Sequence, residues 1–179
     1  MQTELFSPEE QDMAFGCAFC ITGKEHALAE LINRFAPGVT AIVARKENFH
    51  SENGVKSKVE KVILPGYVFF RAPKEADPEI PRDHLIRVLT LDDGDWRLAG
   101  DDERFAEWLF QYGGLLGFSK AYREGDRIRI VEGPLKDMEG QIRRVDKRGH
   151  SGQVALEFNG HVTLVWLGFD LIDPLRKDV

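Results

Sequence analysis

The stretch from Lys61 to Phe70 constrains the fold of this chain more than any other, because it is an apolar extended segment interrupted by Pro65-Gly66. Proline fixes φ and lacks a backbone N–H, whereas glycine adopts dihedral angles that other residues avoid, so the pair predicts a kink. The simplest interpretation is a buried strand after a turn. A second interpretation is that the kink places Leu64 and Tyr67 at a strand entrance, where a partner can reach them.

Residues 13–112 are predicted to form an α+β fold, in which helices flank an antiparallel sheet. We expect residues 1–12, which precede this domain, to form a flexible tail. Apolar runs bounded by turns predict strands, and Asn53-Gly54 predicts a hairpin turn. The expected strands are 15–22, 39–44, 59–64, 67–71 and 85–91.

Two amphipathic helices are predicted from the three- and four-residue spacing of apolar side chains, with a short third one over 79–84. The first spans 24–35 and directs its apolar stripe at the core: Ala27, Leu28, Leu31, Ile32 and Phe35. The second spans 101–112, and we expect Asp101 or Asp102 to cap it. Its stripe is Phe105, Trp108, Leu109 and Tyr112.

Short alternating strands replace the helical period from Tyr122 onward. Tight turns separate them, including Asn159-Gly160, which is a strong hairpin sequence. The expected strands are 126–131, 140–145, 153–158, 161–167 and 170–172. This pattern predicts a small five-stranded β-barrel over residues 122–175, joined to the first domain by a linker over residues 113–121.

The charge of the chain is uneven, which bears on what it binds. Residues 1–120 carry the whole net charge of −6, whereas residues 121–179 hold ten basic and ten acidic side chains. A general polyanion-binding surface is therefore disfavoured, but a local basic patch remains at Arg143, Arg144, Lys147 and Arg148. No apolar run approaches the ~20 residues of a membrane span, and no signal peptide is recognisable, so we expect a cytoplasmic protein.

Catalytic and metal-binding patterns are weak in this sequence. Cys17 and Cys20 form a C-x-x-C pair without the second pair of a zinc site, and we expect reduced thiols that pack as small hydrophobic groups. A cysteine-dependent redox enzyme is the alternative. The five histidines show no ligand spacing, and the aspartate turn at 92–95 lacks the spaced ligands of a calcium loop. We therefore expect no enzyme activity, metal or cofactor.

Two blocks of sequence resemble a known family. Arg123–Ile142, with its Gly133-Pro134 turn and Gly140 before the next strand, resembles the KOW motif. Leu64–Phe70, preceded by Phe15–Cys20, is similar to the N-terminal (NGN) domain of the NusG family of transcription elongation and antitermination factors. The resemblance covers residues 14–173. One departure is that Phe15-Gly16 stands where the family usually has Trp-Tyr.

The resemblance implies a factor that binds the clamp helices of RNA polymerase through its first domain and suppresses pausing or termination. The residues matched to polymerase binding are Phe15, Phe19, Leu64, Pro65 and Tyr67. In the general factor the KOW domain couples polymerase to a ribosomal protein or to Rho. Leu135 and Met138 match its apolar partner-binding positions, and we expect them on an exposed loop.

The specialised LoaP-like paralogues are the better match, because they share the segments Gly133–Gly140 and Val145–Arg148. In those paralogues the KOW domain recognises an RNA hairpin, which here would use Lys136, Arg143, Arg144, Lys147, Arg148 and His150. We therefore expect a monomeric, specialised antitermination factor, with the general elongation factor as the alternative.

Overall fold

The computed structural model describes residues 12–173, so all but the last residue of the expected tail lies outside the described residues. Two compact units make up the chain. The first unites the residues up to Ala44 with Leu64–Gly114, and the second unites Arg45–Ile63 with the residues from Leu115 onward. The first unit mixes helices with strands, whereas the second consists mainly of strands. The predicted α+β class is confirmed.

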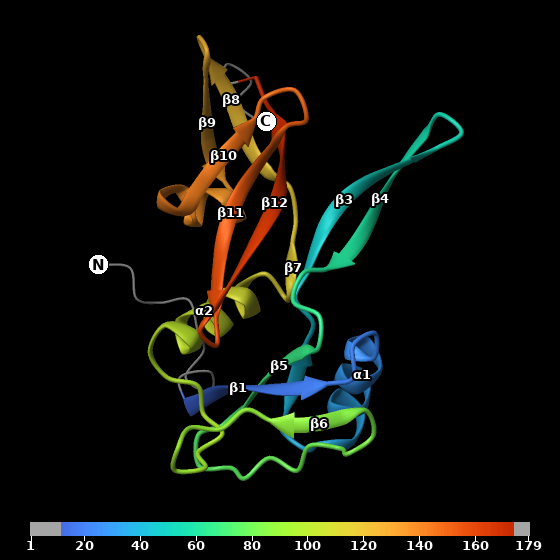
Figure 1. The fold of residues 1–179 in the computed structure, drawn as a ribbon, viewed down its shortest axis with the longest axis vertical. Helices are drawn as coiled ribbons and strands as arrows, with labels where there is room; N and C mark the ends of the chain where they lie inside the picture. The colour runs from blue at the N-terminus through green and yellow to red at the C-terminus, as the bar shows by residue number, and fades with distance from the viewer. Residues whose placement is uncertain (1–11, 174–179) are drawn as a thin grey trace. The chain divides into compact units, whose positions relative to one another are not determined.

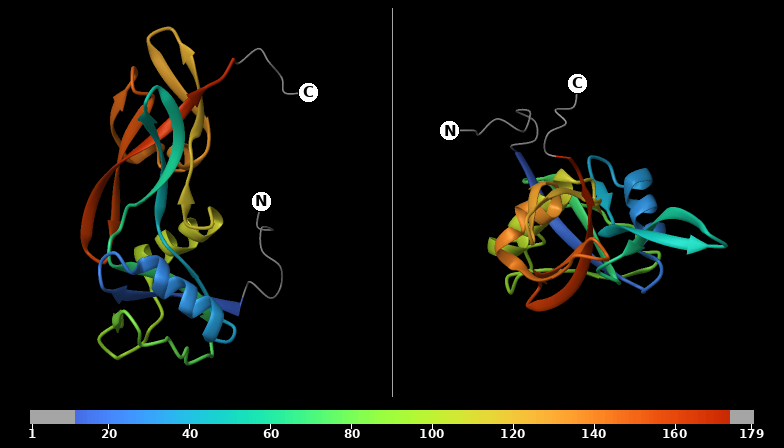
Figure 2. Two further views of the ribbon diagram at one scale, coloured as in Figure 1. Left: turned by 90° about the vertical axis from the view of Figure 1, so that its right-hand side faces the viewer. Right: turned by 90° about the horizontal axis from the view of Figure 1, so that it is seen from above.

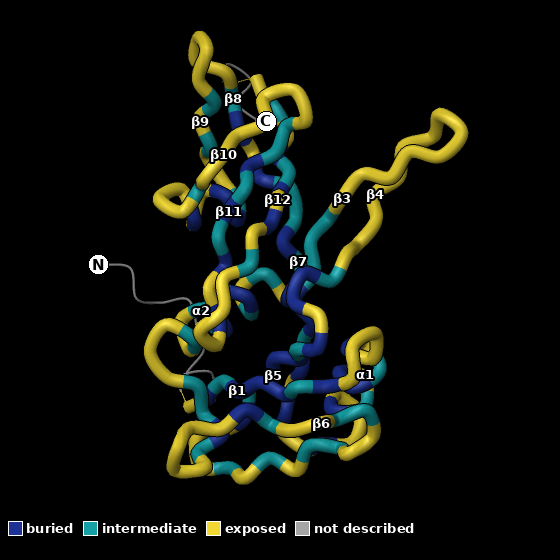
Figure 3. Tube along the Cα trace, viewed as in Figure 1, coloured by how far each residue is buried: buried dark blue, intermediate teal, exposed yellow. Residues whose placement is uncertain are grey.

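An antiparallel four-stranded sheet forms the centre of the first unit, with the order β2-β5-β1-β6. Its strands are β1 (Met13–Cys20), β2 (Thr40–Ile42), β5 (Tyr67–Pro73) and β6 (Leu85–Val88). The central strands are the most buried, as the dark segments of Figure 3 show, and Ala18, Val68 and Phe69 are inaccessible to solvent. Burial on both faces explains why β1 and β5 are nearly continuous apolar runs.

Aromatic side chains fasten α2 (Gly100–Gln111) to one face of this sheet, and Figure 1 shows the helix lying over the strands. Phe69 of β5 meets Phe105 with ring centroids 5.7 Å apart, and Phe15 of β1 meets Phe110 at 5.4 Å. Aromatic pairs at this spacing add to the stabilisation from buried area. The predicted second helix is therefore confirmed, together with the inward role of Phe105.

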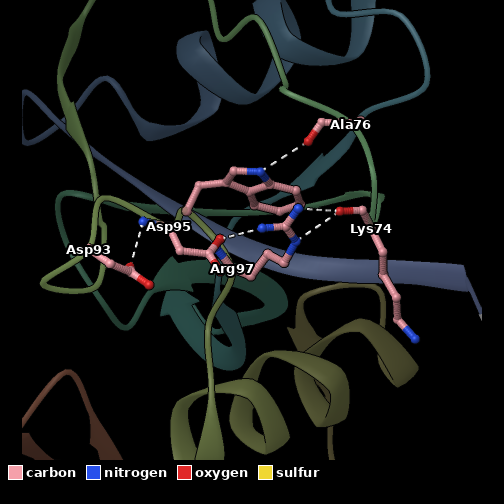
Figure 4. A network of polar contacts seen from close by, with 6 residues as sticks. Lys74, Ala76, Asp93, Asp95 and Arg97 are labelled. Carbon is pink, nitrogen blue, oxygen red and sulfur yellow. Dashed lines mark hydrogen bonds and ion pairs between the residues drawn. The ribbon is translucent and has the colours of Figure 1, made fainter.

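The opposite face of the sheet is covered by Trp96, which stacks on Phe70 at 5.5 Å. Gly16 makes this contact possible, because a Cβ there would lie 2.4 Å from Cζ of Phe70 and 2.9 Å from Cε3 of Trp96. The indole N–H donates to the carbonyl of Ala76 at 3.1 Å (Figure 4), so its polar atom is satisfied. Gly16 thus accommodates a buried tryptophan from another loop.

The first helix, α1 (Glu25–Phe35), is confirmed, but one member of its predicted core stripe is wrong. Leu28 and Ile32 are fully buried, whereas Phe35 is 61% exposed. The buried side of the helix follows Glu25, Leu28 and Ile32, and Ala36 then takes the next inward position. Phe35 is therefore rotated away from the sheet at the end of the helix.

Two further local predictions are wrong. The helix α2 begins after Ala99, which makes no side-chain cap, so Asp101 and Asp102 lie in the first turn and not at the cap. Negative charge is favourable there as well, which explains why the sequence pattern indicated the helix start within one residue. No helix forms over 79–84, where Pro81 lacks an N–H and the chain runs as a loop.

A two-stranded ribbon, β3 (Arg45–Glu52) and β4 (Val55–Val62), belongs to the second unit. Asn53 and Gly54 join the strands with φ angles of 51° and 80°, which confirms the predicted hairpin turn. The strand β7 (Leu115–Leu116) pairs in parallel with β3. The outer part of the ribbon is exposed throughout in Figure 3, and the right-hand view of Figure 2 shows the ribbon as a thin projection.

The second unit also contains a five-stranded sheet with the order β10-β11-β12-β8-β9. Its strands are β8 (Ser119–Glu124), β9 (Arg127–Glu132), β10 (Ile142–Asp146), β11 (Ser151–Phe158) and β12 (His161–Leu171). The expected strand 170–172 is the end of β12, which runs parallel to β8. The expected linker includes β7 and the start of β8, and closure into a barrel stays a prediction.

Among the residues that the structure describes, no helix is long and apolar enough to cross a membrane.

The contact above Gly16 predicts that Gly16→Ala lowers the free energy of unfolding by about 1–3 kcal/mol, because the added methyl group overpacks the Phe70–Trp96 stack. Chemical denaturation followed by circular dichroism measures this. Gly140→Ala is the control, since a Cβ at Gly140 has no neighbour within 4 Å, and it should change stability by less than about 0.5 kcal/mol. Equal stability of both variants would contradict the packing described.

Candidate functional site

The kink predicted at Pro65-Gly66 is a tight turn that ends at the start of β5. The N–H of Tyr67 donates to the carbonyl of Leu64 at 3.2 Å, and Gly66 has a φ of +86°. Proline at the second position and a positive φ at the third are the pattern of a type II turn. A Cβ on Gly66 would also lie 2.9 Å from the Phe19 ring, so glycine is required for two separate reasons.

A buried carboxylate holds this turn, and the sequence analysis assigned it no role. Glu25, in the first turn of α1, is only 3% exposed. Its Oε1 accepts the N–H of Gly66 at 2.7 Å, and both of its carboxylate oxygens accept the N–H of Gly23, at 3.1 and 3.0 Å. The carboxylate therefore links the start of α1 to the Pro65-Gly66 turn, across 41 residues of sequence.

Backbone donors determine the charge state of this carboxylate. Burial by itself would raise the pKa of Glu25, but the N–H groups of Gly66, Glu25 and Gly23, with the nearby His26, lower that pKa below its ordinary value. Glu25 is therefore an anion at neutral pH. The one indication in the sequence was an acidic residue two positions after a glycine, at the start of a helix, where negative charge is favoured.

Three of the five residues matched to polymerase binding lie together beside the turn. Phe19 and Tyr67 are directly opposite each other in the β1–β5 pair, with ring centroids 5.5 Å apart, and both are half-buried. Pro65 is exposed. Phe15 lies on the same face of β1 but four residues away, about 13 Å along the strand, where it contacts Phe110.

The expectation that Leu64 lies on the exposed rim of this surface is wrong. Leu64 is 6% exposed, and the neighbouring Ile63 is 7% exposed. The turn reverses the chain so that its first residue enters the core and Pro65 faces solvent. Leu64 therefore anchors the turn from inside. We call Phe19, Pro65 and Tyr67 the aromatic turn surface.

The expectation that Leu135 and Met138 lie on an exposed loop is also wrong. Leu135 is fully buried and Met138 is 8% exposed. Gly133, with a φ of +100°, leads into the short helix α3 (Pro134–Asp137), and the N–H of Leu135 donates to the buried hydroxyl of Ser119 at 2.9 Å. The helical turn directs these apolar side chains inward, so the motif closes the core of its own unit.

The predicted RNA-binding residues are mostly exposed, and three of them share one turn. Lys147 and Arg148 are exposed and His150 is half-buried, with its ring stacked on Phe169 at 5.6 Å. Asp146 shapes the turn, because one of its carboxylate oxygens accepts the N–H groups of Arg148 and Gly149 at 3.0 and 2.9 Å. The Nζ of Lys147 donates to the carbonyl of Asp126.

The other three basic residues lie apart from that turn. Arg143 and Arg144 are exposed on β10, where a bulge follows Ile142. Lys136 lies on α3 and pairs with Glu139 at 2.7 Å, which lowers the pKa of Glu139. Gly140, the glycine before the next strand in the KOW-like segment, lies in a short 3-10 turn without a positive φ.

Comparison with known proteins identifies the family. The transcription termination/antitermination protein NusG of Thermus thermophilus is 28% identical over 136 residues, which cover 68% of this chain and 72% of the relative. The chain is a NusG homologue. The predicted family is therefore confirmed, and the comparisons do not separate LoaP-like from general members. No protein-family model matches the chain.

A solved structure described as the domain interaction in Thermotoga maritima NusG matches this NusG homologue in fold. The match covers 88% of this chain and 94% of the solved chain, with a TM-score of 0.54. The sequences are only 16% identical, so this likeness concerns the fold alone.

The cysteines of this NusG homologue have the environment of packing residues. Cys17 and Cys20 are unpaired thiols with no exposed surface. Burial raises the pKa of both, and Glu25 adds to the effect on Cys20. A raised pKa disfavours the reactive thiolate, which argues against the redox alternative.

The aspartate turn of this NusG homologue is held by hydrogen bonds and an ion pair to Arg97. The carboxylate of Asp95 accepts the backbone N–H of Arg97 and pairs with its guanidinium at 2.6 Å, and both contacts lower the pKa of Asp95. Arg97 in turn donates to the carbonyl of Lys74 at 2.8 Å (Figure 4). Across residues 12–173, no group of three His, Cys, Asp or Glu side chains could hold a metal ion.

The charge of Glu25 predicts a pH-dependent effect of Glu25→Gln. Because the folded pKa lies below the ordinary value of 4.5, the stabilisation from the anion is complete above pH 4.5 and is lost as the pH falls through the folded pKa. At pH 7 the free energy of unfolding of the variant should be about 1.5–3 kcal/mol lower, which is the range for hydrogen bonds to charged groups. Denaturation at several pH values measures this difference, which should shrink below pH 4.5.

Glu30→Gln is the matched control, because Glu30 lies on the same helix and is exposed. It should leave stability nearly unchanged. If the two variants behave alike at pH 7, Glu25 does not hold the turn.

Proposed function

We propose that this NusG homologue is a specialised transcription antitermination factor that binds RNA polymerase through its first unit and nascent RNA through its second. The observation that carries the polymerase contact is the aromatic turn surface of Phe19, Pro65 and Tyr67. Two half-buried rings and an exposed proline offer apolar area that a partner can cover. Aromatic residues are favoured at protein interfaces because they combine large area with few rotatable bonds.

Rigidity supports this assignment. A type II turn, a required glycine and a buried carboxylate fix the backbone that carries the aromatic turn surface. A surface that is ordered before binding loses little conformational entropy on association. The homologous protein of Thermus thermophilus carries termination and antitermination in its name, and a polymerase-binding surface serves either activity.

The choice of a specialised factor over the general one rests on the second unit. Coupling to a ribosomal protein or to Rho was assigned to Leu135 and Met138, and both are buried. The exposed side chains at Lys147, Arg148, Arg143 and Arg144 instead favour a polyanion. We therefore assign an RNA hairpin to this basic surface, with the guanidinium groups suited to bidentate phosphate contacts.

Polymerase binding is predicted to fall at least about tenfold in the double variant Phe19→Ala/Tyr67→Ala, because central aromatic residues dominate interface energies. The measurement is the affinity of the full chain for core RNA polymerase, with terminator read-through in a transcription assay as a second readout. Phe35→Ala is the control, since Phe35 is an equally apolar, 61% exposed ring on the same unit. Unchanged affinity in a folded double variant would refute the assignment.

Hairpin binding is predicted to weaken in Arg143→Ala/Arg148→Ala. Each lost contact with a paired phosphate should reduce the slope of log affinity against log salt by about 0.9. Anisotropy with a labelled RNA hairpin and the full chain measures both quantities, and Arg34→Ala, an exposed arginine of α1, serves as the control. If the unaltered chain shows no hairpin binding above a non-specific level at low salt, the specialised function is wrong.

A further inference from the structure

A row of side chains on the solvent side of the second unit starts at Arg144 of the basic surface and continues through residues that have no role in the sites above. Arg144 of β10 lies opposite Gln153 of β11, which lies opposite Trp166 of β12. Directly opposed residues of antiparallel strands project from the same face. Their neighbours Val154 and Val165 are buried, so Arg144, Gln153 and Trp166 lie on the outer face.

The row continues into the β3–β4 ribbon. The Nζ of Lys46 donates to the backbone carbonyl of Trp166 at 2.9 Å. Lys46 in turn lies directly opposite Lys61 in the ribbon. The order across the second unit is therefore arginine, glutamine, tryptophan, lysine and lysine, with neighbouring strands about 4.8 Å apart within each sheet.

The two lysines form a like-charge pair, an arrangement that costs stability when residues are directly opposed. Burial and the charge of Lys61 lower the pKa of Lys46. The acids next to the lysine pair, Glu47 and Glu60, project from the other face of the ribbon, where they pair with Lys58 and Arg45. A pair of adjacent cations of this kind fits an anionic ligand.

Trp166 supplies the second element of the site. Its side chain is 37% exposed, and Leu164 on the same face of β12 is 57% exposed. An indole beside cations is the arrangement by which proteins stack a base and neutralise the adjoining phosphates of a single strand. Gln153, half-buried between Arg144 and Trp166, adds donor and acceptor atoms for a base edge or a 2′-hydroxyl.

We propose that the row Arg144–Gln153–Trp166–Lys46–Lys61 binds unpaired RNA, with a base stacked on Trp166 and the flanking phosphates at Arg144 and the lysine pair. The inference rests on the proposed contact with nascent RNA and adds a single-stranded subsite to it. The ligand is a flexible strand that crosses the strands of the sheet. The hairpin contact assigned to Arg143, Lys147 and Arg148 uses paired RNA, and the two subsites share Arg144.

The test is anisotropy of the full chain with a labelled, unstructured RNA of 12 nucleotides. Trp166→Ala should weaken binding at least about fivefold, from the loss of one stacked base. Lys61→Ala should reduce the salt slope by about 0.7, the value for one single-stranded phosphate. The second variant removes a side chain that the structure places in solvent, so it tests the site even if Trp166→Ala fails to fold.

Two controls share the surroundings of the altered residues. Lys56→Ala removes an exposed lysine from the other face of β4, and Val162→Ala removes an exposed apolar side chain from the same face of β12. Both should bind within twofold of the unaltered chain. Binding within twofold for Trp166→Ala and Lys61→Ala as well would overturn the proposal, as would tighter binding of a DNA strand of the same sequence.

Failure of the single-stranded subsite can be distinguished from failure of the proposed function. Trp166→Ala should leave affinity for a blunt RNA hairpin and for RNA polymerase unchanged. Loss of single-strand binding with both of these retained supports the subsite. If Trp166→Ala retains binding of the single strand, the hairpin and the polymerase, only the subsite is refuted. If the unaltered chain binds no polymerase, the proposed function is refuted.

Discussion

The hydrogen bond from Gly66 to the buried carboxylate of Glu25 connects the start of α1 to the turn that carries the aromatic turn surface. Gly66 donates this bond from a turn in which its φ is +86°, and Glu25 accepts it from the first turn of α1. Burial penalises the anion, and three backbone N–H groups compensate for that penalty. Because both partners are buried, loss of either one leaves an unsatisfied polar group in the core.

The position of the aromatic turn surface follows from this connection. Tyr67 begins β5 directly after Gly66, and the register of β5 against β1 then sets Phe19 opposite Tyr67. A rotation of the turn would move Pro65 and Tyr67 together, and a shift of register by one residue would exchange the two faces of the strand. The surface therefore depends on the hydrogen bond from the Gly66 N–H to the Glu25 carboxylate more than on contacts among its own side chains.

The sequence predicted the features that are encoded locally. Strand and helix positions follow from apolar periodicity, and the hairpin turns at Asn53-Gly54 and Asn159-Gly160 follow from residues that tolerate positive φ. What it missed depends on long-range contact. The role of Glu25 requires Gly66, 41 residues away, and the inward direction of Leu135 requires Ser119. Nothing near either residue in the sequence specifies that partner.

The same distinction explains the errors at the surface. A conspicuous apolar residue beside a turn, such as Leu64 or Met138, was interpreted as exposed, whereas both complete a core. Conversely, Phe35 fits a helical stripe but lies outside, because Ala36 takes the inward position. Gly16 illustrates a third case, in which Trp96 from a distant loop packs in the space above the glycine.

The most direct test of the central claim is the Gly66 amide proton, followed by NMR as a function of pH. A bond to an ionised carboxylate predicts a slowly exchanging proton whose chemical shift titrates with a midpoint below 4.5, together with the carboxyl carbon of Glu25. The amide of Gly54, exposed at the tip of the β3–β4 ribbon, provides the comparison. An amide of Gly66 that exchanges as fast as that of Gly54 and does not respond to pH would contradict the account.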